Sequence, residues 1–267
     1  MDKSLFSEEF LKKLDKLVFI SKNIPSGSDS GVQKTYKKGS SLEFNDYRTY
    51  SPGDDIRSID WNVWERLGQL FLKLYSADVD RTVSILIDTS SSMGTDKLTF
   101  SLQTAAALGY IGIKNQDRVS ISSITDTIVD YMKPTKGKGD IISLFNFLSS
   151  LKSGGKTDLS RALKEVSLKN PKNSIIILLS DLLDFEGFKD GIYHLLYKKF
   201  DIVVLHTLSA NDLAPNFSGP VRLKDSETGA VLDLTVNRET LTAYKNTMSA
   251  YFKKIENICL EKRIEYI

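Results

Sequence analysis

The chain has 267 residues, of which 41% are hydrophobic and 26% are charged, as in ordinary globular proteins. Its 36 basic and 34 acidic residues leave a net charge of +2 with both signs mixed along the chain, which argues against a dedicated nucleic-acid-binding protein. The single cysteine, Cys259, rules out an intrachain disulfide, and no apolar run reaches the ~18 residues of a membrane span. We therefore expect a cytoplasmic protein with no membrane span in this chain, in which Cys259 is a small core residue on a late helix.

The first 41 residues predict a helix followed by a loop. Residues 5–20 place apolar side chains at helical spacing, and residues 22–41 are rich in Gly, Ser and Lys. Residues 42–82 contain aromatic and charged residues without helical periodicity. We expect them to form a small β-rich subdomain packed beside the main sheet.

From residue 83 to residue 267, segments typical of strands and helices alternate. The expected strands are 83–88, 119–124, 127–132, 174–181, 200–208 and 264–267. The expected helices are 97–114, 140–151, 159–168, 188–198 and 238–262. Near-continuous apolar strands indicate a sheet covered by helices on both faces. We therefore predict a doubly wound α/β fold with a mostly parallel sheet, interrupted by a hairpin at about 219–235 with a Glu-Thr-Gly turn.

Oxygen-bearing side chains gather where three segments of this predicted sheet end. The residues are Asp88, Ser90 and Ser92, then Thr157 and Asp158, then Ser180 and Asp181. Ligands collect beyond the carboxyl ends of the strands in such sheets. Carboxylates and hydroxyls suit a hard cation such as magnesium, Mg²⁺, with Mn²⁺ or Ca²⁺ as alternatives. No His or Cys belongs to the set, which disfavours zinc.

A simpler interpretation of the same residues is a set of turn and helix-capping side chains, since Ser, Thr and Asp are common N-caps. Asp158 in particular is expected to cap the helix that follows it. His194 and His206 are expected to be packing residues. No glycine-rich phosphate-binding motif occurs in the chain.

Two motifs resemble known families. Asp88-Thr89-Ser90-Ser91-Ser92 resembles the D-x-S-x-S sequence of the metal-ion-dependent adhesion site (MIDAS) in von Willebrand factor A domains, with Thr157 and Asp181 matching its second-loop threonine and third-loop aspartate. The segment 42–75 resembles the bacterial family called domain of unknown function 58, and that resemblance covers about residues 40–240. Residues 62–66, Asn-Val-Trp-Glu-Arg, depart mildly from the family pattern.

The resemblance implies a metal-dependent protein-interaction module, an adaptor or chaperone-like protein, and not an enzyme. It implies that Ser90, Ser92 and Thr157 bind the ion directly. Asp88 and Asp181 would bind directly or through water, and a partner's carboxylate would be the sixth ligand. The residues expected around the partner contact are Ser91, Met93, Lys156 and Leu182, with Leu183 as an alternative to Leu182. By family association, the partner would be a MoxR-type AAA+ ATPase.

Two other functions are compatible with the sequence. A magnesium-dependent phosphoryl-transfer enzyme could use Asp88 as its nucleophile. Phosphatases that resemble haloacid dehalogenases need a second acid two residues further on, where this chain has Ser90. A structural subunit with an empty site is the third alternative.

Charged residues around a tryptophan in the upstream segment allow two interpretations. The residues are Asp54, Asp55, Arg57, Asp60 and Trp61. They could form a partner-binding surface, or an internal network of ion pairs and hydrogen bonds. We favour the internal network, with Arg57 and Asp60 as its pair.

Overall fold

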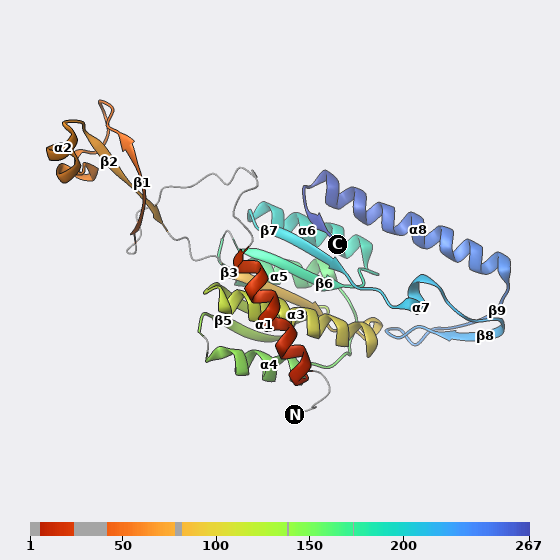
Figure 1. Cartoon of the computed structure of the whole chain (residues 1–267). Coiled ribbons are helices and arrows are strands. Elements are labelled where there is room, and N and C mark those ends of the chain that lie inside the picture. The colour runs from red at the N-terminus through yellow and green to blue at the C-terminus, as the bar shows by residue number, and fades with distance from the viewer. Residues whose placement is uncertain (1–5, 24–41, 78–81, 138, 173) are drawn as a thin grey trace. The chain divides into compact units, whose positions relative to one another are not determined.

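The computed structural model describes residues 6–23, 42–77, 82–137, 139–172 and 174–267 (Figure 1). The chain divides into two compact units. The larger unit contains the N-terminal helix and everything from β3 onward, and the smaller one contains residues 42–77. Each is described separately below.

A six-stranded sheet with the order β10-β7-β6-β3-β4-β5 forms the centre of the larger unit. Its strands are β3 (Thr82–Asp88), β4 (Arg118–Ile124), β5 (Ile128–Thr135), β6 (Ile175–Ser180), β7 (Asp201–His206) and β10 (Glu265–Tyr266). All neighbours are parallel except β5, which is antiparallel to β4. Only three residues connect β4 to β5, too few for the crossover that a parallel pair needs. The predicted fold class is confirmed.

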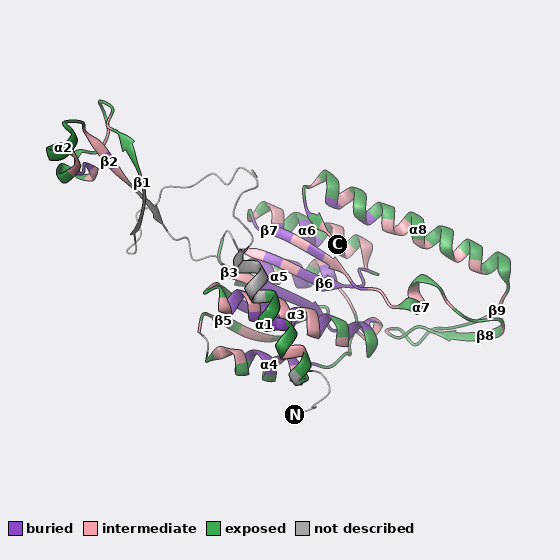
Figure 2. Ribbon diagram, in the orientation of Figure 1, coloured by how far each residue is buried: buried purple, intermediate pink, exposed green. Residues whose placement is uncertain are grey.

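Helices cover both faces of the sheet, as the apolar strands predicted. The covering helices are α1 (Glu8–Asn23), α3 (Asp96–Lys114), α4 (Asp140–Ser150), α5 (Leu159–Lys169), α6 (Phe185–Tyr197) and α8 (Arg238–Glu261). The four-residue helix α7 (Ala210–Leu213) contributes no residue to either core. Ile85 and Ile87 of β3 join a core with α1, α3 and α4, while Leu86 points into a second core with α5, α6 and α8. Cys259 is fully buried in that second core, as expected. Figure 2 shows the central strands β3 and β6 largely buried, the edge strand β5 partly exposed and most of α8 exposed.

A hairpin of β8 (Gly219–Lys224) and β9 (Val231–Val236) lies between α7 and α8, where the sequence predicted one. Its turn is organised by Asp225, whose Oδ1 accepts hydrogen bonds from the backbone N–H groups of Glu227 (2.9 Å) and Thr228 (2.6 Å). Gly229 takes the left-handed conformation at φ 72° that closes the turn. Most of both strands is exposed (Figure 2).

The smaller unit pairs β1 (Leu42–Thr49) with β2 (Phe71–Ala77) in an antiparallel ribbon. A 3-10 turn, η1 (Ile56–Ser58), and a short helix, α2 (Trp61–Leu67), connect the two strands. The segment is therefore a two-stranded ribbon with helical connections. Its expected packing beside the sheet stays a prediction.

No helix in the part of the chain that the structure describes is long and apolar enough to cross a membrane.

Candidate functional site

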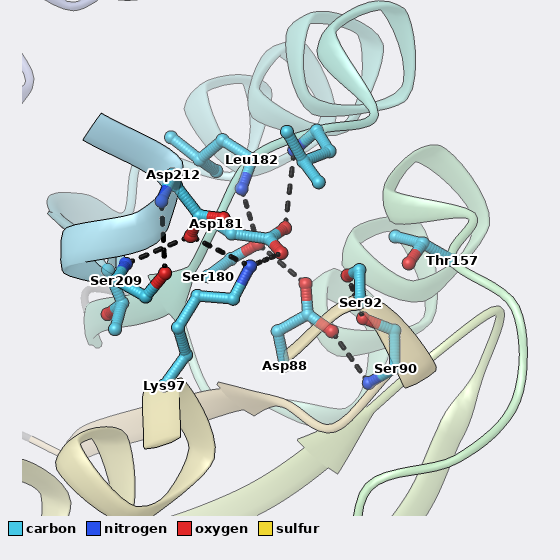
Figure 3. Close-up of polar contacts among 12 residues, drawn as sticks. Asp88, Ser90, Ser92, Lys97, Thr157, Ser180, Asp181, Leu182, Ser209 and Asp212 are labelled. Carbon is cyan, nitrogen blue, oxygen red and sulfur yellow. Dashed lines mark hydrogen bonds and ion pairs between the residues drawn. The ribbon is translucent and has the colours of Figure 1, made fainter. Parts of the chain in front are cut away.

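The carboxylate of Asp88 lies at the centre of the polar residues that end the strands (Figure 3). Asp88 is the last residue of β3 and is fully buried. Its Oδ1 accepts the backbone N–H of Ser90 at 2.9 Å, and its Oδ2 accepts the hydroxyl of Ser180 at 2.6 Å. Ser180 ends the neighbouring strand β6, which pairs in register with β3. Parallel pairing thus brings together the loop after β3 (the first loop) and the loop after β6 (the third loop), as the sequence predicted.

The hydroxyls of Ser90 and Ser92 form a close pair beside Asp88. Their Oγ atoms are 3.0 Å apart, on either side of the start of the 3-10 turn η2 (Ser91–Met93). Neighbouring ligands of an octahedral Mg²⁺ are about 2.9 Å apart, given metal–oxygen distances of 2.0–2.1 Å. The two hydroxyls are hydrogen-bonded to each other, and their spacing is also compatible with two neighbouring ligands of one small cation.

Backbone hydrogen bonds hold the loop between α4 and α5 (the second loop) against the first loop. The N–H of Ser91 donates to the carbonyl of Gly155 (3.1 Å), and the N–H of Gly154 donates to the carbonyl of Thr89 (2.7 Å). Gly155 has a φ of 86°, which an L-residue rarely adopts. These contacts place Thr157 on the same edge as Ser90 and Ser92 (Figure 3).

Thr157 also contacts a residue that the sequence interpretation did not single out. Its hydroxyl donates to Oε1 of Glu227 at 2.7 Å, and its backbone N–H donates to Oε2 at 3.1 Å. Glu227 lies in the turn of the β8–β9 hairpin. In the amino-acid sequence, the acidic run Asp225-Ser226-Glu227 was the one signal that could have indicated a contact with the polar site.

Asp181 of the third loop is paired with a buried lysine. Lys97, in the first turn of α3, places its Nζ 2.8 Å from Asp181 Oδ2 and 3.3 Å from Asp212 Oδ2. Asp181 Oδ1 accepts the backbone N–H of Leu183 at 3.3 Å. A lysine at the start of an apolar helix gave no signal that would have identified this role from sequence.

The electrostatics of the site follow from burial. Burial raises the pKa of Asp88 to about 6, and the charge of Asp181 adds to the effect, although hydrogen bonds from Ser180 and Ser90 act in the opposite direction. Burial would lower the pKa of Lys97, but its pairing with Asp181 and Asp212 raises it above the ordinary value of a lysine. Within the described part of the chain, Asp88 forms no ion pair with a cationic side chain, and hydrogen bonds from the Ser90 N–H and the Ser180 hydroxyl offset its burial.

The donor set fits a hard cation. The described residues contain no group of three or more His, Cys, Asp or Glu side chains placed to hold one ion. A cation at this edge would thus depend on the hydroxyls of Ser90, Ser92 and Thr157 together with Asp88 and Asp181. Oxygen atoms of this kind are the ligands that Mg²⁺, Mn²⁺ and Ca²⁺ accept.

Two of the residues expected to touch a partner are not at the surface. Met93 is 1% exposed and Leu182 is fully buried, each in one of the two hydrophobic cores. This corrects the expectation for these two residues, because their side chains pack into the hydrophobic cores beneath the loops. Lys156 is exposed and Ser91 half-buried, while Leu183, the alternative to Leu182, is 54% exposed.

The remaining polar predictions have mixed outcomes. Asp158 caps α5 by accepting the N–H of Arg161 at 2.9 Å, as expected. His194 is exposed, so its prediction as a packing residue is wrong. His206 does more than pack: its Nε2 lies 2.9 Å from the carbonyl oxygen of Asp181 and its Nδ1 lies 2.7 Å from the Tyr266 hydroxyl. A carbonyl only accepts, so Nε2 carries the proton, and His206 ties β7 and β10 to the third loop.

The charged segment in the smaller unit contains an internal network, but not with the expected pair. Asp60 is 5% exposed and accepts the Tyr47 hydroxyl (2.8 Å) and the N–H of Asn62 (3.0 Å), with Lys73 Nζ at 3.1 Å. Arg57 is exposed and forms no ion pair among the residues described. Lys73, from β2, takes the role that the sequence interpretation gave to Arg57.

Two more of these residues make local contacts, and the tryptophan is exposed. Asp54 pairs with Arg48 at 2.7 Å, and Asp55 accepts the backbone N–H of Arg57 at 3.0 Å. Trp61 is 56% exposed. The network therefore centres on Asp60 and leaves Trp61 outside it.

Comparison with known proteins places these features in a family. The model of the family described as "Protein of unknown function DUF58" matches residues 46–252. The uncharacterized proteins Mb1516 of Mycobacterium bovis and Rv1480 of Mycobacterium tuberculosis are each 20% identical over 207 residues, 74% of this chain and 65% of theirs. The chain thus spans just under two thirds of the length of these curated relatives.

Two solved structures are similar in part. The conserved hypothetical protein BatB from Bacteroides thetaiotaomicron matches 70% of this chain and 89% of its own, with 16% identity and a TM-score of 0.41. A von Willebrand factor type A structure from Catenulispora acidiphila matches 49% of this chain and 34% of its own, with 13% identity and a TM-score of 0.36. Because the family model matches well over half of its residues, this chain belongs to the DUF58 family of proteins of unknown function.

Proposed function

We propose that this DUF58 protein is a metal-dependent protein-interaction module, in which a divalent cation at the carboxyl end of the sheet binds a carboxylate of a partner protein. The observation that carries the proposal is the close pair of Ser90 and Ser92 hydroxyls, 3.0 Å apart beside the buried carboxylate of Asp88. Turn and capping chemistry alone would not require two hydroxyls and a carboxylate to meet at a buried strand end.

In this proposal the hydroxyls of Ser90, Ser92 and Thr157 hold the ion directly, as in a metal-ion-dependent adhesion site. Asp88 and Asp181 act directly or through water. Two observations support this division. Both oxygens of Asp88 already accept hydrogen bonds, and Lys97 partly neutralises Asp181. A cation held largely by neutral hydroxyls stays electron-poor, and it would gain from an external carboxylate.

The proposed partner is a MoxR-type AAA+ ATPase, with this chain in an adaptor or chaperone-like role in the cytoplasm. The partner's identity rests on the family resemblance alone. The exposed Lys156 beside the site supports an acidic approach, because its positive charge attracts carboxylates.

A phosphoryl-transfer enzyme has less support. A nucleophilic Asp88 must reach a phosphorus atom, yet it is fully buried and both of its oxygens accept hydrogen bonds. Ser90 stands where the general acid of such enzymes is needed, and a hydroxyl is a poor proton donor at neutral pH. We therefore propose a role without catalysis.

The proposal is tested by titrating Mn²⁺ or Mg²⁺ into the full chain by calorimetry. We expect one site, and we expect Ser90→Ala and Thr157→Ala to weaken it at least about tenfold. The matched control for metal affinity is Ser91→Ala, which removes a hydroxyl of the same loop that is not among the proposed ligands of the ion. Equal affinity in wild type and Ser90→Ala would defeat the metal site.

The partner is tested by capture of a purified MoxR-type ATPase with and without EDTA, next to a phosphatase assay on a generic phosphate ester. Capture that depends on Mg²⁺ and is lost in Thr157→Ala supports the adaptor. Capture that is equal with and without EDTA would contradict the adaptor proposal. Phosphate-ester hydrolysis that is lost in Asp88→Ala would favour the phosphoryl-transfer enzyme.

A further inference from the structure

We propose that Glu227, in the turn of the β8–β9 hairpin, is an internal carboxylate ligand that occupies the position a partner's carboxylate would take. The inference rests on the proposed function, since it concerns the cation site at Ser90, Ser92 and Thr157. It assigns the hairpin a role as a built-in competitor that a partner must displace.

The contact is a short hydrogen bond whose length is also compatible with two ligands of one cation. Glu227 Oε1 lies 2.7 Å from Thr157 Oγ1, close to the roughly 2.9 Å that separates neighbouring ligands of one small cation. The Thr157 hydroxyl donates its proton to the carboxylate, which leaves its oxygen lone pairs free for a cation. Thr157 can therefore keep Glu227 and bind an ion at the same time.

Burial distinguishes Glu227 from the rest of the turn. Glu227 is half-buried, whereas its neighbours Asp225, Ser226, Thr228 and Gly229 are all exposed. The contact joins segments 70 residues apart and engages both the side chain and the backbone of Thr157. A solvated surface glutamate would not be expected to engage both oxygens with one distant residue.

The turn is organised to present this carboxylate. Hydrogen bonds from the backbone N–H groups of Thr228 and Glu227 hold the pKa of Asp225 below its ordinary value, and the charge of Lys156 adds a smaller effect. The Asp225 N–H donates to the Ala230 carbonyl at 2.8 Å. Asp225 therefore fixes the backbone at Glu227.

Little apolar packing holds the hairpin in place. Neither β8 nor β9 contributes a residue to the two hydrophobic cores of the described chain. Leu223, Val231 and Leu232 are 44%, 56% and 60% exposed. Because little apolar packing holds the hairpin, its tip can move away from Thr157 at low cost. A carboxylate of a partner can therefore replace Glu227 at the site.

The experiment compares wild type with Glu227→Gln and with the matched control Asp233→Asn. Asp233 lies on the same hairpin and pairs with Arg222 at 2.7 Å. Each variant removes one negative charge from the hairpin, but only Glu227 contacts Thr157. Mn²⁺ affinity is measured by calorimetry, and hydrogen–deuterium exchange of residues 225–230 is measured with and without Mg²⁺.

We expect Mg²⁺ to slow exchange in the turn of wild type and Asp233→Asn but not of Glu227→Gln. Mn²⁺ affinity should fall about tenfold in Glu227→Gln alone, because ligand charge sets affinity at such sites. Mn²⁺ binding and turn protection that are equal in wild type and Glu227→Gln would overturn this inference and leave the proposed function intact. A wild type that binds no Mn²⁺ would overturn both.

Discussion

The ammonium group of Lys97 lies 2.8 Å from Oδ2 of Asp181, and both side chains are buried. Figure 3 shows the lysine reaching from α3 toward Asp181 and Asp212. Removing one member of a buried ion pair leaves the other charge without compensation, which costs more than the pair itself contributes.

We therefore expect Lys97→Met to lower the free energy of unfolding by about 3–5 kcal/mol. The double variant Lys97→Met/Asp181→Asn should lose less than the sum of the two single variants, because they share one interaction. Denaturant unfolding measures both effects. Lys245→Met, at an exposed position on α8, is the control and should change stability by no more than about 0.5 kcal/mol. Strict additivity of the two site variants would show that the pair is not coupled.

The hydroxyl of Ser180 should stabilise the fold independently of any cation. It donates to Asp88 and also accepts the N–H of Leu182 at 3.0 Å. Ser180→Ala removes both interactions inside the protein, and we expect a loss of about 1–3 kcal/mol of unfolding free energy in EDTA.

Ser84→Ala is the matched control for Ser180→Ala. Ser84 is fully buried in the same sheet, but its hydroxyl meets no hydrogen-bond partner among the described residues. Its removal should be neutral or stabilising. Similar losses in the two variants would mean that the Ser180–Asp88 bond adds nothing.

In the smaller unit, Asp60 should matter more than Arg57. Burial opposes the charge of Asp60, but hydrogen bonds from Tyr47, Lys73 and Asn62 hold its pKa below the ordinary 3.8. Its stabilisation is therefore full above that value and is lost as the pH falls through the lowered pKa of the folded state.

We expect Asp60→Asn to accelerate proteolysis within residues 42–77 at pH 7, while Arg57→Ala leaves the rate near that of wild type. The difference between Asp60→Asn and wild type should shrink below about pH 4 in an acid-active protease. A larger effect from Arg57→Ala would restore the pair expected from the sequence.

The thiol of Cys259 should be inert in the folded protein. It is fully buried, and burial raises its pKa to about 11. A thiol that stays protonated and inaccessible reacts slowly with disulfide reagents. We expect negligible labelling at pH 8 in native buffer and one thiol per chain in guanidinium chloride. Rapid native labelling would show that the last turns of α8 open easily.

The sequence was sufficient to predict the edge of the sheet where the polar residues gather. Apolar strands that end in Asp88 or lead directly into Asp181 have a direct physical signature, because parallel strands align their carboxyl ends. The contacts of Lys97 and Glu227 have no such signature. Each depends on where a distant helix or hairpin lies in space, and residue type and spacing do not encode that position.

The same limit explains why Met93 and Leu182 were wrongly expected at the surface around the partner contact. Met93 and Leu182 follow strand ends just as Ser91 and Leu183 do, and nothing local distinguishes an inward from an outward side chain. Leu182 adopts a left-handed backbone at φ 53° with its side chain fully buried. Only the packed cores determine which of two adjacent leucines is exposed.

The hydrophobic cores extend beyond the segment that matches the family. The family match covers residues 46–252, yet Leu14 of α1 packs beneath α3 and α4, and Asp15 accepts the Tyr110 hydroxyl at 2.5 Å. At the other end, Ile255, Cys259 and Ile264 complete the opposite core. A chain trimmed to the matched residues would therefore uncover apolar surface on both faces of the sheet at once, and would aggregate for reasons unrelated to its binding site.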